Sequence, residues 1–374
     1  MAANSTPTTL PATMRAWVYK TTKGGIENTL KLIPDYPIPD HFRTLPSPPA
    51  GKGDAVLVKI LAASLNPIDH KLTELPIVGG LVQKKPATPA VDFCGRVVRV
   101  PANSSSPLKA GQLVAGKLPP QSQHGALAEY AVAYSTNIVP VPSGVSVEQA
   151  ATIGICGSTA WTAVVPQIEA ARERNKKTGG AEPLRIFING GSGGIGSFAV
   201  PIAKALGCHV TATCSGANAN LVKNTLGADD TIDYRTTNVS EALIKKTKEA
   251  GRPFDVGVDA IGMKFGLYKA ADHFLAPGAQ FPRIGMEFST ITDAIAIVYR
   301  PTFLGGGQHV SPFVEGRATT RILTSLLDLM EQGKLNIPLD GGAAVPFSDV
   351  PRAYARLKSH RTQGKIVVRV TGDN

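Results

Sequence analysis

The spacing of apolar residues changes character along the chain. From residue 14 to about residue 145, short apolar runs alternate with turns rich in glycine and proline, as at 14–19, 56–60, 91–100, 111–116 and 125–132. Many short strands of this kind predict an irregular, barrel-like β domain. Gly95, inside the run at 91–100, predicts a bulge or a barrel corner. Residues 20–53 are rich in proline and are expected to be rich in loops.

The middle of the chain alternates between strand-like and helix-like patterns. Helical character begins near residue 146 and continues over 158–171, and strands are predicted at 184–189, 209–214, 230–233, 254–259 and 279–285. Such alternation predicts a parallel, doubly wound sheet. An amphipathic helix at 317–333 and a strand at 364–370 follow. We therefore expect a β domain built from 1–145 and 311–374 around an inserted α/β domain at 146–310.

A glycine-rich motif stands between the first predicted strand of the middle domain and the helix after it. It spans 191–196 as G-x-G-x-x-G, and Gly207 ends the helix. Strand, glycine turn and helix together form the context in which this motif binds a dinucleotide, with the pyrophosphate at the helix N-terminus. The predicted cofactor contacts in this motif are Gly191, Ser192, Gly193, Gly194 and Ile195.

Composition argues against several classes of protein: nucleic-acid-binding, disulfide-rich, membrane-spanning and secreted proteins. The net charge is +11, but the one basic cluster, at 172–177, has no interleaved aromatic residues, so nucleic-acid binding is not favoured. The four cysteines lack C-x-x-C spacing, which argues against a structural zinc lobe and against a disulfide framework. No apolar run approaches the length of a membrane span, and the first dozen residues lack the pattern of a secretory signal. We therefore expect a cytoplasmic protein without a membrane partner.

Several motifs together resemble those of the medium-chain dehydrogenase/reductase superfamily. They include NPIDHK at 66–71, PAVDFCGRVV at 89–98, GALAEY at 125–130, GGSGGIG at 190–196 and LGADDTIDY at 226–234. The likeness spans about residues 14–370 and is nearest to the zinc-free quinone oxidoreductase branch and the fungal trans-acting enoyl reductases. It implies an α/β protein with a GroES-like catalytic domain and a Rossmann cofactor domain, working as a monomer or homodimer.

The same resemblance locates the positions of a catalytic metal. Zinc-dependent members have a cysteine where this chain has Asn66, and a His-Glu pair where it has Val91 and Asp92. The third ligand position falls near Ile155 and Cys156. A catalytic zinc needs three protein ligands and an open position, so the sequence predicts no metal.

The preference between NADPH and NADH is predicted from the end of the strand at 209–214, the second strand of the middle domain. No carboxylate follows Cys214, whereas NAD-preferring sites commonly carry one there for the ribose hydroxyls. By resemblance to NADPH-using relatives, Ser215, Lys223 and Tyr234 are expected around the 2′-phosphate, although the basic residue usual after the serine is missing. Thr159 is expected at the pyrophosphate. Gly262 and Ile284 end strands at the cleft edge, where cofactors bind in open sheets. NADPH is the expected cofactor.

Without metal ligands, conjugate reduction fits better than alcohol oxidation, because negative charge then collects on a carbonyl oxygen that hydrogen-bond donors can stabilise. Lys71, Asn66 and the hydroxyls of Ser158 and Thr159 are the candidate donors, with Asp69 as a supporting group. A purely structural NPIDHK turn is the alternative. The expected substrate is a small or carrier-bound enone or enoyl compound, as in fungal secondary metabolism. A quinone or carbonyl reductase and a non-catalytic cofactor-binding protein remain open.

Overall fold

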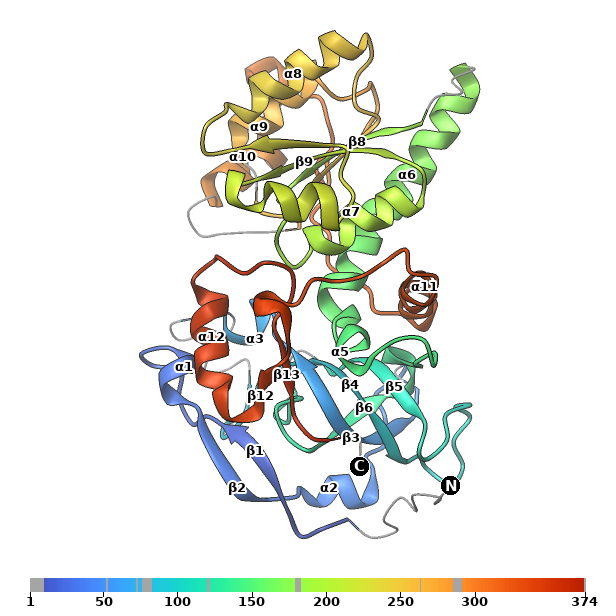
Figure 1. Cartoon of the computed structure of the whole chain (residues 1–374), viewed down its shortest axis with the longest axis vertical. Helices are drawn as coiled ribbons and strands as arrows, with labels where there is room; N and C mark the ends of the chain where they lie inside the picture. Colours follow the sequence, from blue (N-terminus) through green and yellow to red (C-terminus); the bar gives the residue numbers. More distant parts are fainter. Residues whose placement is uncertain are drawn as a thin grey trace. The chain divides into compact units, whose positions relative to one another are not determined.

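The structure is a computed structural model, and it describes residues 10–51, 53–71, 73–75, 83–119, 122–178, 183–262, 264–284 and 291–372 (Figure 1). It divides into two compact units. The terminal unit comprises Met1–Ser158, Ala318–Gln332 and Ile337–Asn374, and the central unit comprises Thr159–Arg317 and Gly333–Asn336. The boundaries predicted from the sequence were 145/146 and 310/311. Among the described residues, no helix has the length and apolar character needed to cross a membrane.

The terminal unit is built around a mostly antiparallel sheet in the order β12-β13-β3-β4-β5-β7, with β6 also pairing with β3. Its strands are β3 (Ala55–Ser64), β4 (Asp92–Arg99), β5 (Leu113–Lys117), β6 (Tyr130–Tyr134), β7 (Ile138–Pro140), β12 (Val345–Pro346) and β13 (Val367–Arg369). The register of β3 against β4 shifts near Gly95, where an added Cβ would lie 2.3 Å from the Lys59 carbonyl oxygen. This close approach confirms the irregularity predicted at Gly95.

Residues 20–53, predicted to be rich in loops, also contain short regular elements that the sequence did not predict. The structure forms α1 (Ile26–Thr29), β2 (Lys31–Pro37) and α2 (Asp40–Thr44), and β2 pairs with β1 (Thr13–Val18) in a separate two-stranded sheet. Both Pro34 and Pro37 lie in β2, which has β1 as its partner on one edge. An edge strand tolerates proline because its outward N–H groups need no partner in the sheet.

The terminal unit also contains further helices. They are α3 (Ile68–Lys71), α5 (Val147–Ala150), α11 (Thr320–Glu331) and α12 (Val350–Lys358), with a π-helical turn at Ile153–Gly157. Helix α12 was not predicted from the sequence, although its Val350, Ala353 and Tyr354 are buried. These residues follow helical spacing, so the signal was present in the sequence.

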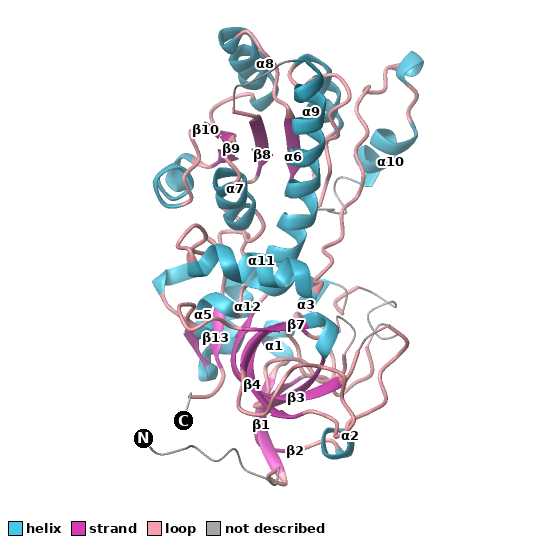
Figure 2. Ribbon diagram, turned by 90° about the vertical axis from the view of Figure 1, so that its right-hand side faces the viewer, coloured by secondary structure: helices cyan, strands magenta, loops and turns pink. Residues whose placement is uncertain are grey.

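The central unit contains a parallel sheet, as predicted, and its strands lie in the order β10-β9-β8-β11. Its strands are β8 (Arg185–Asn189), β9 (His209–Cys214), β10 (Asp230–Asp233) and β11 (Val256–Asp259). Its helices are α6 (Ser158–Thr178), α7 (Gly196–Ala205), α8 (Val239–Ala250), α9 (Phe265–Ala270) and α10 (Ile291–Tyr299). The strands β8, β9 and β10 lie side by side (Figure 2), with α8 and α9 on one face of the sheet and α7 on the other (Figure 1).

The strand predicted at 279–285 is reduced to an extended segment with isolated bridges. Arg283 bridges Asp259 on one side and Phe313 on the other, both in parallel. Proline at 282 and at 312 removes backbone donors, which limits how far a regular ladder can extend. Gly285 lies outside the described residues.

One face of the central sheet is held by an aromatic cluster. The ring of Phe187 lies edge-to-face against those of Phe254, Phe274 and Phe281, with centroids 6.3, 5.8 and 6.0 Å away. Phe187 lies in the middle of β8, the strand that leads into the glycine motif. Such pairs stabilise a core by about 1 kcal/mol each beyond their burial, so the cluster fixes the position of β8.

Candidate active site

A glycine-rich turn joins β8 to α7 and is anchored on the neighbouring strand β9. The N–H of Gly190 donates to Thr213 Oγ1 at 2.7 Å, and the N–H of Gly191 donates to the Thr213 carbonyl oxygen at 2.8 Å. Gly190 has a φ of +92°, a conformation that favours glycine. The residues at 191–195 that the sequence assigned to the cofactor follow one another in this turn.

The glycines of the turn have different surroundings. A Cβ added at Gly196 would lie 2.1 Å from the Gly190 carbonyl oxygen, so the start of α7 packs directly on the turn. A Cβ added at Gly193 would meet no protein atom within 4 Å apart from those of its two neighbours in the chain. Gly193 therefore leaves bare backbone beside open space close to a helix N-terminus. This cradle fits the pyrophosphate of a dinucleotide, which needs close approach to backbone N–H groups.

A side-chain network ties together the ends of the strands next to this turn. Asn189 Nδ2 donates to Asp259 Oδ1 at 2.7 Å, and Thr213 Oγ1 donates to Asn189 Oδ1 at 2.7 Å. These residues belong to β8, β9 and β11, where the order of the sheet reverses, which is the usual ligand position in such sheets. Asn189 and Thr213 were not among the residues predicted from the sequence. Polar residues at the carboxyl ends of buried strands were the available signal.

Gly262 and Ile284, which were predicted to contact the cofactor, both donate hydrogen bonds to Asp259. The N–H of Gly262 donates to Asp259 Oδ2 at 2.9 Å, and the N–H of Ile284 donates to the Asp259 carbonyl oxygen at 2.9 Å. The structure thus joins these two residues, through Asp259 and Asn189, to the start of the glycine turn.

The loop after β9 carries the residues predicted for a 2′-phosphate. Ser215 is buried, and Asn218 Nδ2 donates to Ser192 Oγ at 3.1 Å, which connects this loop to the glycine turn. Lys223 is exposed, and Tyr234 has 51% of its surface exposed. Both side chains are therefore accessible to a ligand.

A carboxylate that was not predicted from the sequence lies beside the same loop. A Cβ added at Gly216 would lie 2.7 Å from Asp233 Oδ2. The other carboxylate oxygen, Oδ1, accepts a 2.9 Å hydrogen bond from the N–H of Arg235. Asp233 is the last residue of β10 and precedes Tyr234. It brings a negative charge close to the loop in which no carboxylate was expected.

Thr159, the predicted pyrophosphate contact on α6, packs against the backbone at Gly316. It is 5% exposed, and a Cβ at Gly316 would lie 2.2 Å from Thr159 Oγ1. Gly316 therefore provides the space that the threonine hydroxyl occupies.

The predicted catalytic residues lie in and before the short helix α3. The N–H of Asn66 donates to Asp69 Oδ2 at 2.7 Å, which closes the turn at Pro67. Asn66 is fully buried, and its Nδ2 donates to the Ser64 carbonyl oxygen at 3.3 Å and to Asp92 Oδ2 at 2.9 Å. Both side-chain N–H groups of Asn66 are thus engaged. Lys71, at the end of α3, is exposed.

Burial perturbs the two carboxyl groups near this turn. It raises the pKa of Asp69 to about 8, against the opposing effect of the hydrogen bond from the Asn66 N–H. Burial also raises the pKa of Asp92, whereas the nearby Lys365 lowers it. Asp69 Oδ1 is buried without a hydrogen-bond partner. The raised pKa favours the protonated form of Asp69 at neutral pH.

The residues at the expected metal positions do not form a zinc site. Val91 is buried and cannot ligate a metal, and the amine of Lys365 lies between Asn66 and Cys156, 2.7 Å from Asn66 Oδ1 and 3.5 Å from Cys156 Sγ. Within the described part of the chain, no three His, Cys, Asp or Glu side chains are grouped closely enough to hold a metal. A catalytic zinc does not fit this set of donors.

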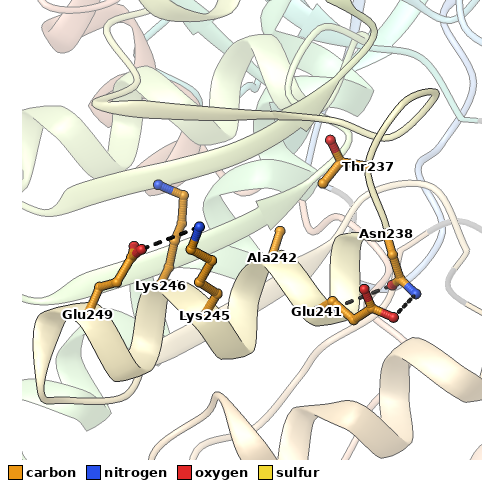
Figure 3. Close-up of a pocket in the computed structure, with 7 residues that line it drawn as sticks. All are labelled: Thr237, Asn238, Glu241, Ala242, Lys245, Lys246 and Glu249. Carbon is orange, nitrogen blue, oxygen red and sulfur yellow. Dashed lines mark hydrogen bonds and ion pairs between the residues drawn. The ribbon is translucent and has the colours of Figure 1, made fainter.

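A shallow hollow along α8 is lined by residues with no predicted role in cofactor binding (Figure 3). Its polar side chains pair with one another: Asn238 Nδ2 donates to Glu241 Oε1 at 2.9 Å, and Lys245 forms an ion pair with Glu249 at 3.7 Å. Asn238 also caps α8 by accepting from the N–H groups of Ser240 and Glu241. The hollow is thus a solvated helix face and is separate from the cofactor cradle.

Comparison with known protein families supports both halves of this architecture. Residues 52–143 match the alcohol dehydrogenase GroES-like domain, and residues 226–368 match the zinc-binding dehydrogenase family. The quinone oxidoreductase of Coxiella burnetii has the same fold, with a TM-score of 0.72 at 24% identity, over 96% of this chain and 99% of that one. The predicted pairing of a GroES-like with a Rossmann-type unit is confirmed.

Two relatives by sequence are similar over most of their length. The trans-enoyl reductase pgmF of Aspergillus terreus is 37% identical over 369 residues, covering 97% of this chain and 98% of the relative. The chloroplastic quinone-oxidoreductase QR1 of Triphysaria versicolor is 33% identical and covers 87% of this chain and 92% of the relative. With the glycine turn and the sheet-edge network, these similarities show that the chain belongs to the medium-chain dehydrogenase/reductase superfamily, in its zinc-free branch, and is an oxidoreductase that uses a nicotinamide cofactor.

Proposed function

We propose that this protein is an NADPH-dependent reductase that adds hydride to the electron-poor C=C bond of an enone or enoyl thioester, free or carrier-bound. The observation that carries the proposal is the near-complete alignment with a relative named as a trans-enoyl reductase. The cradle at Gly193 and the Asn189–Asp259 network support binding of a dinucleotide next to the ends of β8 and β11. The similarity to a quinone oxidoreductase supports the same hydride chemistry.

The preference for NADPH rests on the loop after β9. Ser215 stands where a carboxylate would repel a 2′-phosphate, and Lys223 and Tyr234 are accessible to bind it. Asp233 opposes this preference, because its carboxylate lies beside Gly216. The preference between NADPH and NADH therefore depends on the balance of Lys223 and Asp233. Substituting Asp233 with Asn should increase the affinity for NADPH relative to NADH.

The bound nicotinamide supplies the hydride, and the protein binds and polarises the substrate. Negative charge gathers on the substrate carbonyl oxygen as hydride adds to the β-carbon. Lys71 is the proposed cation for that oxygen, since it is exposed at the end of α3. Asn66 and Asp69 are proposed to position α3, because both side chains are buried and the Asn66 N–H is bonded to Asp69.

A substrate panel tests the proposal. Purified protein would be given NADPH with a simple enone, an enoyl thioester or a quinone, and oxidation of NADPH would be followed by absorbance. We expect turnover of the enone or enoyl thioester with a kcat/KM at least tenfold above that for the quinone. Faster quinone reduction would instead support the second candidate, a quinone or carbonyl reductase, which the similarity to QR1 favours.

A third outcome would be cofactor binding without turnover of any substrate class. This would support a non-catalytic cofactor-binding protein, the hypothesis motivated by the net charge of +11. Salt-sensitive binding of RNA by the same preparation would then be the next measurement. The three outcomes are distinct, so one preparation decides between them.

A further inference from the structure

Four buried polar residues from distant parts of the chain meet inside the terminal unit. Asn66 follows β3, Asp92 begins β4, Cys156 lies in the π-helical turn and Lys365 precedes β13. Each of them is at most 4% exposed. We call this group the Lys365 cluster. A buried lysine is rare in a protein interior unless it is paired, so its surroundings need an explanation.

The amine of Lys365 lies at the centre of the cluster. Its Nζ donates to Asn66 Oδ1 at 2.7 Å and to the Leu65 carbonyl oxygen at 3.0 Å. Cys156 Sγ lies 3.5 Å from Nζ, and Asp92 Oδ2 forms an ion pair with it at 4.0 Å. Oxygen and sulfur atoms thus surround one cation.

The remaining polar atoms of the cluster are also satisfied. Asn66 Oδ1 accepts from Cys156 Sγ at 3.3 Å as well as from Lys365. The two oxygens of Asp92 accept from the N–H of Ile155 at 2.8 and 2.9 Å. Gly154 makes this approach possible, because a Cβ there would lie 2.1 Å from Asp92 Oδ1. The turn before α6 is therefore shaped around the Asp92 carboxylate.

Asn66, Asp92 and Cys156 stand at or beside the positions where zinc-dependent relatives are expected to hold their metal. We propose that Lys365 provides a fixed internal cation in place of that metal, which both excludes a metal ion and holds Asn66, Asp92 and Cys156 in place. A zinc ion requires ligands about 2.0–2.3 Å away. The lysine amine lies between two of these side chains, 2.7 Å from Asn66 Oδ1 and 3.5 Å from Cys156 Sγ. Loss of the amine leaves Asp92 buried without its counter-ion.

The cluster also extends toward the proposed catalytic residue. Asn66 is hydrogen-bonded to Lys365 through its side chain and to Asp69 through its backbone N–H. Asp69 lies in α3 together with Lys71. Lys365 is thus a positioning residue for α3. This extension rests on the proposed function, whereas metal exclusion and the coupling to Asp92 do not.

Cobalt titration tests the proposal without any substrate. Co²⁺ would be added to the unsubstituted protein, to Lys365→Ala, and to Lys365→Ala combined with Cys156→Ala, and the near-ultraviolet band of thiolate-bound cobalt would be recorded. We expect no such band in the unsubstituted protein, a saturable band in Lys365→Ala, and its loss in the double variant. The double variant serves as the control for the other buried thiols, Cys94, Cys208 and Cys214.

Thermal unfolding gives a second measurement if Lys365→Ala fails to fold. Lys365→Met keeps most of the side-chain volume but removes the charge, and we expect the unfolding temperature to fall by about 10 °C. Combining it with Asp92→Asn removes both charges and should recover at least half of that loss. Lys204→Met is the control: its ion pair with Asp229 at 2.8 Å is a third exposed, so its loss should change the unfolding temperature by only about 2 °C.

Three results would overturn the proposal. The first is a Cys156-dependent cobalt band in the unsubstituted protein. The second is a folded Lys365→Ala variant that gains no band. The third is a pair of losses from Lys365→Met and Asp92→Asn that simply add, since independent residues show no coupling. If these measurements succeed but no enone is turned over by the parent protein, then the proposed function fails while the cation proposal stands.

Discussion

Asn189 Nδ2 donates a 2.7 Å hydrogen bond to Asp259 Oδ1, and the two residues face each other at the ends of the parallel strands β8 and β11. Asn189 is the last residue before the glycine turn. Through Thr213, which donates to Asn189 Oδ1, the same network reaches β9. The start of the cofactor cradle is therefore fixed by side chains from three strands rather than by the turn alone.

Replacing Asn189 with Ala should weaken binding of NADPH and NADH about tenfold, because it removes two hydrogen bonds next to the turn. Fluorescence titration of both cofactors measures this. Asn175→Ala is the matched control, since Asn175 Nδ2 also donates to a carboxylate, Asp255 Oδ1, at 3.0 Å, but beyond the amino ends of the strands. A loss of affinity as large in the control would show that the effect is a general loss of stability.

Gly193→Val should abolish binding of either cofactor while leaving the unfolding temperature almost unchanged. The protein has room for the side chain, since beyond the two neighbouring residues no atom lies within 4 Å of the position that a Cβ would take. The pyrophosphate requires that space. Gly266→Ala, at another glycine with open space, is the control and should bind normally. Isothermal titration together with thermal unfolding checks both statements. Normal cofactor affinity in Gly193→Val would place the pyrophosphate elsewhere.

Lys223→Ala should weaken NADPH binding about fivefold to tenfold and leave NADH binding unchanged, because only NADPH carries the 2′-phosphate that an exposed ammonium can contact. Lys245→Ala removes another exposed lysine of the central unit and is the control. Parallel titrations with the two cofactors provide the measurement. If the parent protein prefers NADH, or if both affinities fall together, the assignment of the 2′-phosphate site is wrong.

Lys71→Ala should reduce turnover of an enone about a hundredfold, or ~3 kcal/mol, with the affinity for NADPH unchanged. Lys71→Arg should recover little, because guanidinium and ammonium differ in shape and hydration. Steady-state kinetics of these variants, with Lys20→Ala as an exposed-lysine control in the same unit, checks the assignment. Near-normal turnover of Lys71→Ala would leave Lys71 as a surface lysine at the end of α3.

The sequence predicted the parts of the fold that depend on local patterns. The glycine turn, the strands β8 to β11 and the irregular strand around Gly95 follow from spacing within a few residues. The segment at 279–285 was predicted as a strand because it is apolar, yet its prolines limit it to bridges. Helix α12 was missed although its apolar residues follow helical spacing.

The site was harder to predict, because its contacts join distant segments. Asn66 was expected to donate to a substrate, but its N–H groups are engaged by Ser64 and Asp92. Another partner of its side chain, Lys365, lies 299 positions away in sequence. A single sequence contains no signal for such a pairing, since the lysine itself resembles any other residue before a strand. The sequence singled out Asn66 and Asp69 as polar groups of the site, and the roles open to them depend on these partners.

Asp69 should make the stability of the protein depend on pH in a direction opposite to that of an ion-paired carboxylate. Burial raises its pKa to about 8 in the folded state, whereas an unfolded aspartate has a pKa of about 3.9. Between these values the folded chain holds a proton that the unfolded chain has lost. The contribution of Asp69 to stability is therefore complete below about pH 4, falls by up to about 1.4 kcal/mol per pH unit, and is lost above about pH 8.

Asp69→Asn resembles the protonated group and lacks this loss. Its advantage in unfolding temperature over the parent should therefore widen from about pH 5 to about pH 8 and then level off. Asp54→Asn is the control, because hydrogen bonds from Ser104 to Ser106 lower the pKa of Asp54 and its difference from the parent should stay constant over that range. A constant difference for Asp69→Asn would show that Asp69 is ionised throughout and that its burial is compensated by Lys365.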